Sequence, residues 1–187
     1  MNTMQNVKQF TGTGTPPPAA AGAGKGAARS WELLTGLNQS LAHAIDLRSR
    51  TKQTHWSAKG GNFHALHKMF ADFSSELDSI ADELAERIMA LGGLPVSTPS
   101  MIARISKLPP CPIGIVQATG HFDALVAGYE VAIKHLLATM SKAVRGDDHA
   151  TASILTGFAR LLKEQKGNVA AHIPVEWAIP AKQRSIG

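Results

Sequence analysis

The sequence predicts an all-α protein built as a bundle of four long helices. Apolar residues recur every three or four positions over four long segments, which is the spacing of helices with one buried face. No window combines the period-two alternation and β-branched composition of a strand. The chain has 187 residues, enough to bury one core without disulfide or metal support, so a single helical domain is expected.

Helix boundaries are expected where capping and breaking residues occur. Ser30 is a suitable N-cap for the first helix, and the glycines at 92 and 93 should end the second. The long helices are expected over 30–56, 62–91 and 115–145, and from about 148 to 173. Proline is favoured at the first position of a helix, so Thr98–Pro99 should open a short extra helix between the second and third. The long connection at this point is compatible with one crossover.

The remaining segments are expected to be tails. Residues 1–29 are rich in Gly, Ala, Pro, Thr and Gln without periodicity, which is typical of a flexible arm. The expected organisation is therefore an arm over 1–29, the bundle over 30–174 and a C-terminal tail over 175–187. One cysteine permits no internal disulfide, and no apolar stretch reaches the length of a membrane span. A cytoplasmic location and no membrane association are expected.

The second expected helix carries polar residues that do not face its own bundle. Its apolar stripe consists of Phe63, Leu66, Phe70, Phe73, Leu77, Ile80, Leu84, Ile88 and Leu91. At about 100° per residue, Asp82 and Glu86 fall on nearly the opposite face, and His67 lies on one flank. His55 ends the preceding helix. Imidazole and carboxylate together suit Fe(II), Mn(II) or Zn(II), so these four residues are candidate metal ligands.

A second copy of the chain would bring these ligands together. Small residues at Ala71, Ser75, Ser79 and Ala85 share the outward face and permit close approach of another helix. An antiparallel copy crossing near Ser75 on a two-fold axis would direct His67 of one chain towards the carboxylates of the other. The alternative is that the carboxylates form a solvated charged face.

Two stretches match a known family. THWSAKGGNFHALHKMF and DELAERIMALGG resemble the signature of the Dps family (DNA-binding proteins from starved cells, or mini-ferritins) in the ferritin-like superfamily. The resemblance runs from about Leu33 to His172 and includes GDDHATASILT. The spacing is specific: His67 lies twelve residues after the histidine of HW, and DxxxER begins fifteen residues after His67.

The resemblance implies both an assembly and an activity. It implies a ferritin-like bundle assembled as a hollow dodecamer that oxidises Fe(II), preferably with hydrogen peroxide, and stores ferric mineral while protecting DNA. It also implies that His55 and His67 of one chain bind iron with Asp82 and Glu86 of its two-fold partner, with Glu86 as the bridging candidate. The expected cofactor or substrate metal is thus iron, and the expected surroundings are the bacterial cytoplasm and nucleoid.

One position departs from the family pattern. The family usually has an aspartate four residues after the second histidine, where this chain has Ala71. The hypothesis is that the first iron position is intact while the second, at His67, lacks a carboxylate. Asp78 or His64 could compensate; the alternative is that both are ordinary surface or interface residues. The rival function is a non-specific DNA-binding, nucleoid-compacting shell protein with weakened ferroxidase activity.

Charge in the expected arm suggests a second interaction. Residues 1–29 carry Lys8, Lys25 and Arg29 and no acidic residue, out of a net charge of +5 for the chain. Repetition in a dodecamer would strengthen a weak, sequence-independent contact with DNA. A solubilising or shell-stabilising extension is the alternative. Asp147 and Asp148 are expected either to line a pore through which iron enters or to cap the last helix.

Overall fold

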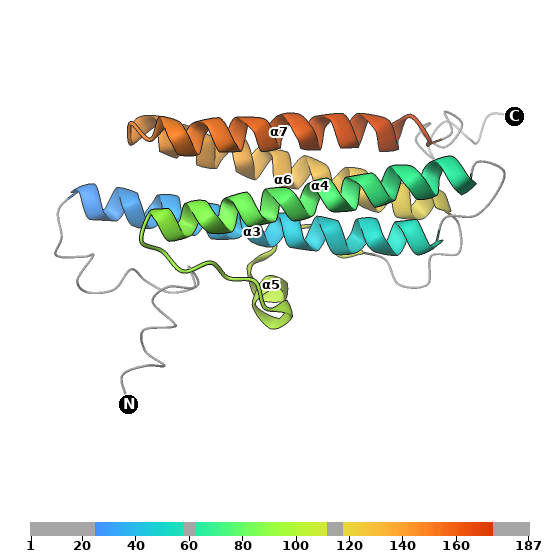
Figure 1. Ribbon diagram of the computed structural model, residues 1–187, viewed down its shortest axis with the longest axis horizontal. Helices are drawn as coiled ribbons and strands as arrows, with labels where there is room; N and C mark the ends of the chain where they lie inside the picture. The colour runs from blue at the N-terminus through green and yellow to red at the C-terminus, as the bar shows by residue number, and fades with distance from the viewer. Residues whose placement is uncertain (1–24, 58–62, 112–117, 174–187) are drawn as a thin grey trace, which may run out of the picture.

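The computed structural model describes residues 25–57, 63–111 and 118–173, and all regular secondary structure in these ranges is α-helical. The helices are α3 (Lys25–Ser57), α4 (Phe63–Ala90), α5 (Pro99–Ile105), α6 (Ala118–Arg145) and α7 (His149–Ala170) (Figure 1). The predicted fold class, four long helices with a short extra helix between the second and third, is confirmed. In the described part of the chain, no helix is long and apolar enough to cross a bilayer.

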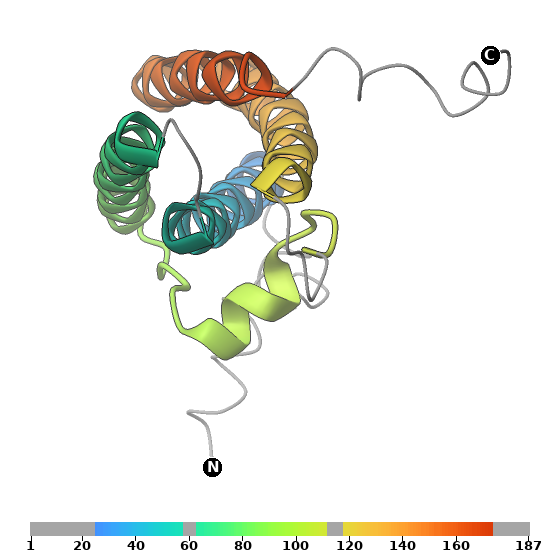
Figure 2. The same ribbon diagram turned by 90° about the vertical axis from the view of Figure 1, so that its right-hand side faces the viewer.

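The four long helices surround one apolar core. Helix α3 packs against α4 and α6, and α7 packs against α6 and α4, so α4 and α6 lie diagonally across the bundle (Figure 2). The long connection between α4 and α6 carries α5, which lies outside the bundle beside α3. The largest fully buried side chains are Tyr129, Phe70, Phe158, Leu37, Leu41, Leu47, Leu77, Leu84, Ile88, Leu125, Leu136 and Leu155.

Helix α3 begins earlier than the sequence predicted. It starts at Lys25, whereas Ser30 was the expected N-cap, and Ser30 lies inside the helix. The sequence KGAAR supplies two alanines and two long basic residues, which are strong helix formers and extend the helix backwards. Lys25 and Arg29 therefore belong to α3 and not to an arm. Lys8 and the predicted C-terminal tail of residues 175–187 lie outside the described residues.

Two glycines end α4 for different reasons. Gly92 adopts a φ of +76°, a left-handed conformation that glycine accepts without steric cost. Gly93 lies so close to α3 that an added Cβ would stand 2.6 Å from Cδ2 of Leu34. The predicted stop at these residues is therefore correct, and Gly93 also allows the end of α4 to pack against α3.

The segment of residues 94–109, here called the α5 strap, is held on α3 by side chains that bind its main chain. The Asn38 amide donates to the carbonyl of Leu94 at 3.2 Å and accepts from the N–H of Val96 at 3.0 Å. A small apolar cluster lies beneath the strap. It consists of Ala42, Val96, Ile102 and Ile105, with Ile45 and Met101 packed against it.

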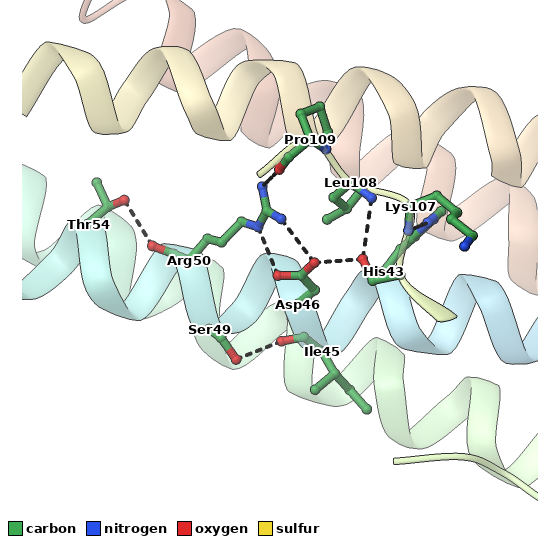
Figure 3. Close-up of polar contacts among 10 residues, drawn as sticks. His43, Ile45, Asp46, Ser49, Arg50, Thr54, Lys107, Leu108 and Pro109 are labelled. Atoms are coloured by element: carbon green, nitrogen blue, oxygen red, sulfur yellow. Dashed lines mark hydrogen bonds and ion pairs between the residues drawn. The ribbon is translucent and has the colours of Figure 1, made fainter. Parts of the chain in front are cut away.

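A charged pair on α3 fixes the end of the strap (Figure 3). Arg50 donates to both carboxylate oxygens of Asp46, at 2.8 and 3.1 Å, and also to the carbonyl of Pro109 at 2.6 Å. Asp46 in turn accepts from the Ser106 hydroxyl at 2.6 Å. The bonds to Pro109 and Ser106 join residues about sixty positions apart, and they hold the α5 strap against α3.

His43 completes this contact as a neutral imidazole. Its Nε2 accepts the N–H of Lys107 at 3.2 Å, so its proton must be on Nδ1 (Figure 3). Burial lowers the pKa of His43 to about 4, and the neighbouring His135 lowers it further than Asp46 raises it. Burial also lowers the pKa of His135, whose Nε2–H donates to the carbonyl of Gly36 at 2.9 Å. Both rings are therefore neutral at physiological pH.

Acid should destabilise the protein through His43. The His43 imidazole is protonated below pH 6.5 in the unfolded protein but only below about pH 4 in the folded protein. The free energy of unfolding therefore falls as the pH drops from 6.5 to about 4. This one residue should lower the free energy of unfolding by about 2 kcal/mol between pH 7 and pH 5. Urea unfolding at fixed protein concentration measures it. His43→Gln should flatten the pH dependence, and His172→Gln, at an exposed site, should leave it unchanged; an equal slope in all three proteins would refute this assignment.

Candidate functional site

The fold brings the two predicted histidine ligands into contact. His55 lies at the end of α3 and His67 near the start of α4, at the same end of the bundle (Figure 1). Their ring centroids are 3.5 Å apart and their planes are inclined by 32°. The sequence placed both residues in the same candidate site but gave no means of predicting this stacked geometry.

A hydrogen bond fixes which nitrogen of His55 can bind a metal. Nδ1 of His55 lies 2.9 Å from the backbone carbonyl oxygen of His67. A carbonyl oxygen only accepts, so Nδ1 carries the proton and Nε2 keeps its lone pair. Metal-binding histidines are commonly oriented by such a bond from the other ring nitrogen. The arrangement therefore fits a metal ligand.

Asp82 and Glu86 lie in the opposite half of α4, on its exposed face, while Leu84 and Ile88 point into the core. At 1.5 Å of helix rise per residue, Asp82 lies roughly 22 Å along α4 from His67. Within the described residues of one chain, no three His, Cys, Asp or Glu side chains converge as metal ligands. One chain therefore cannot gather these four candidate ligands around one ion.

Small side chains separate the histidine half of this face from the carboxylate half. Ser75 and Ser79 are exposed, and Ala71 and Ala85 are partly buried. Because these four side chains are small, the backbone of another helix can approach α4 closely at these positions. This face suits contact with a second α4.

Two other acidic residues of α4 are already paired. Asp78 forms an ion pair with Arg48 of α3, with side chains 50% and 40% exposed respectively. Asp72 pairs with Lys68 at 2.8 Å along its own helix, on the exposed surface. Asp78 was predicted as a possible extra ligand, but its pairing with Arg48 could not be predicted because the contact joins residues thirty positions apart on different helices.

Asp148 acts as a helix cap. Its carboxylate accepts from the N–H of Thr151 at 3.0 Å and from Arg87 of α4 at 2.7 Å. Partial burial alone would raise the pKa of Asp148, but the bonds from Thr151 and Arg87 outweigh it and hold the pKa below its usual value. Asp147 is exposed and pairs with His149. Of the two expected roles, the structure shows the cap; a role of Asp147 at a pore stays a prediction.

One layer of the largely apolar interior joins polar side chains of three helices by hydrogen bonds. The buried phenol of Tyr129 donates to the side-chain carbonyl of Gln165 at 3.0 Å, and the amide of Gln165 donates to Glu76 at 2.7 Å. Burial raises the pKa of Tyr129, and the nearby Glu76 carboxylate raises it further. This layer joins α4, α6 and α7, and it was not predicted because each residue alone looks like an ordinary helix position.

Comparison with known proteins supports the same family. A family model for the ferritin-like domain matches residues 34–174. A DNA protection during starvation protein of Agrobacterium fabrum is 34% identical over 73% of this chain and 85% of its own length. DNA protection during starvation protein 2 of Bacillus anthracis is 32% identical over 68% of this chain and 86% of its own.

Solved structures share the fold. The structure of an archaeal Dps homologue from Halobacterium salinarum superposes with a TM-score of 0.75 at 26% identity, covering 79% of this chain and 82% of that one. The domain match and the identities over most of two relatives agree with the motif assignment. The chain belongs to the Dps family of the ferritin-like superfamily.

Proposed function

We propose that this protein oxidises Fe(II) at a site completed by two copies and stores the ferric product inside a closed shell, taken to be a dodecamer. The observation that carries the proposal is the separation of the candidate donors. His55 of α3 and His67 of α4 lie together at one end of the bundle with the His55 tautomer fixed, and the exposed carboxylates lie in the other half of α4. An antiparallel second copy would unite His55 and His67 with Asp82 and Glu86 at two equivalent places. The ferritin-like fold supports iron as the metal.

The residues suit this chemistry. Neutral imidazoles and carboxylates bind Fe(II) and leave coordination positions open to an oxidant. Two Fe(II) ions each give one electron to hydrogen peroxide, which takes up two protons and leaves as two water molecules, so no hydroxyl radical is released. Glu86, as the bridging carboxylate, would hold the two ions together so that both electrons reach the same peroxide.

A second function has its own support. The relatives from Agrobacterium and Bacillus are named for DNA protection, and Lys25 and Arg29 lie in the first turns of α3 near the chain start. We propose that the shell also contacts DNA in the cytoplasm without reading its sequence. The alternative function is that of a nucleoid-compacting shell with weakened ferroxidase activity, and Ala71 favours it. A protein with this function would oxidise iron slowly and retard DNA strongly in a gel.

Removing ligands should abolish oxidation. His55→Ala and Glu86→Gln should each lower the initial rate of Fe(II) oxidation by hydrogen peroxide at least about tenfold, because each deletes a donor that holds the substrate. The rate is followed by absorbance of the ferric product. Glu83→Gln, an exposed change on α4 beyond the proposed ligand set, is the matched control. If both ligand variants oxidise Fe(II) at the wild-type rate, the ferroxidase proposal is refuted. If the wild-type protein oxidises Fe(II) no faster than the reaction without protein, the DNA-compacting function is favoured.

Removing charge at the chain start should weaken DNA binding. The combined substitutions Lys8→Gln, Lys25→Gln and Arg29→Gln keep the start of α3, which deletion of residues 1–29 would remove. Each lost phosphate contact should reduce the slope of log affinity against log salt by about 0.9, and retardation at about 50 mM salt should largely disappear. Iron oxidation should not change. An unaltered salt slope would show that these cations do not bind DNA.

A further inference from the structure

The antiparallel register of the proposed site has a consequence for Ala71. Moving four residues forward from His67 on one α4 reaches Ala71, and moving four residues back from Asp82 on the other reaches Asp78. A register that sets His67 opposite Asp82 therefore sets Ala71 opposite Asp78 of the second copy. The same relation holds at both equivalent sites of a two-fold pair.

The donor set needs a further carboxylate at this point. Two histidines and two carboxylates give two Fe(II) ions only four donor groups, and the ion at His67 has no acid of its own chain within one turn on that flank. Asp72 is rotated about 100° from Ala71 and is held by Lys68. Within one chain, Asp78 lies roughly 16 Å along α4 from His67, so it cannot reach that ion. Among the described acidic residues of α4, Asp78 of the second copy is the one that the proposed register sets opposite Ala71.

Arg48 holds the Asp78 carboxylate in each chain. Arg48 and His55 share one face of α3, two turns apart, and His67 and Asp78 share one flank of α4, three turns apart. The pair is partly exposed, and Nε of Arg48 has no partner that meets hydrogen-bond geometry, so the contact is ionic and not a directed bond. Such a contact can be exchanged for another cation.

From this placement, and on the basis of the function proposed above, we infer that Asp78 of the second copy supplies the carboxylate that Ala71 lacks. Without metal, the Asp78 carboxylate pairs with Arg48 of its own chain. When the ion at His67 binds, the carboxylate leaves Arg48 and binds this ion. The guanidinium competes with Fe(II) for one carboxylate, so the second ion should bind more weakly than the first. Arg48 is thus a positioning residue that sets the affinity of the second position.

His64 is a less suitable substitute. It lies one turn before His67, on the side away from Ala71, and the same register sets it opposite Ala85 of the second copy. Its imidazole is neutral when it binds metal and would not replace the missing negative charge.

Zn(II) titration of the intact assembly by calorimetry tests the inference, because zinc binds such donors without oxidation. Wild-type protein should bind two ions per chain, one tightly and one weakly. Asp78→Asn should keep only the tight ion. Arg48→Gln should tighten the weak ion about tenfold by removing the competing charge. Asp72→Asn, which breaks the comparable pair with Lys68, is the matched control and should behave as wild type. Light scattering checks that each variant remains assembled.

A rescue variant separates a ligand from a structural residue. Asp78→Asn combined with Ala71→Asp should regain the second ion, whereas a variant that fails through misfolding would not. Two ions retained in Asp78→Asn would overturn the inference, and loss of one in His64→Ala would then identify His64 instead. If wild-type binding is abolished by His55→Ala but unmoved by Asp78→Asn, the inference fails while the proposed function stands. If neither His55→Ala nor Asp78→Asn changes zinc binding, the inference and the proposed function are both overturned.

Discussion

The division of donor groups along α4 is the constraint on which the account depends. One face of this helix fills the core with Leu77, Leu84 and Ile88, so its polar residues must face outward. The histidine contact at one end and the carboxylates at the other are separated by several turns of rigid helix. No side-chain movement can close a gap of roughly 20 Å. The proposed iron chemistry at these residues therefore requires a second copy of the chain.

The fold could be predicted from sequence because its determinants are local. The period of the apolar residues fixed the long helices, and Gly92–Gly93 marked the end of α4. The start of α3 was misplaced because Ser30 is a good cap in isolation, yet the preceding residues KGAAR favour helix as well. The contacts of the α5 strap could not be predicted. The sequence gives no sign that His43 accepts a hydrogen bond from the N–H of Lys107, because the two residues are far apart along the chain.

The candidate site was predictable in composition but not in detail. Helix periodicity placed Asp82 and Glu86 outward, and motif spacing added His55 and His67. Three contacts of the site join residues that are distant in sequence. They are the bond from His55 to the His67 carbonyl, which fixes the tautomer, the Arg48–Asp78 pair and the Arg87–Asp148 pair. These contacts change the interpretation of single residues. Asp148 is committed to capping α7, while Asp78 is held at the flank where Ala71 leaves space.

Complementation between two defective chains tests the shared site most directly. One chain carries His55→Ala and His67→Ala, the other Asp82→Asn and Glu86→Gln, and the two are co-expressed and purified as one assembly. A two-fold pair of unlike chains contains one site with all four native donors and one with none, so random pairing should restore about a quarter of the wild-type Fe(II) oxidation rate. If the mixed assembly oxidises iron no faster than either chain alone, the site is not shared between copies.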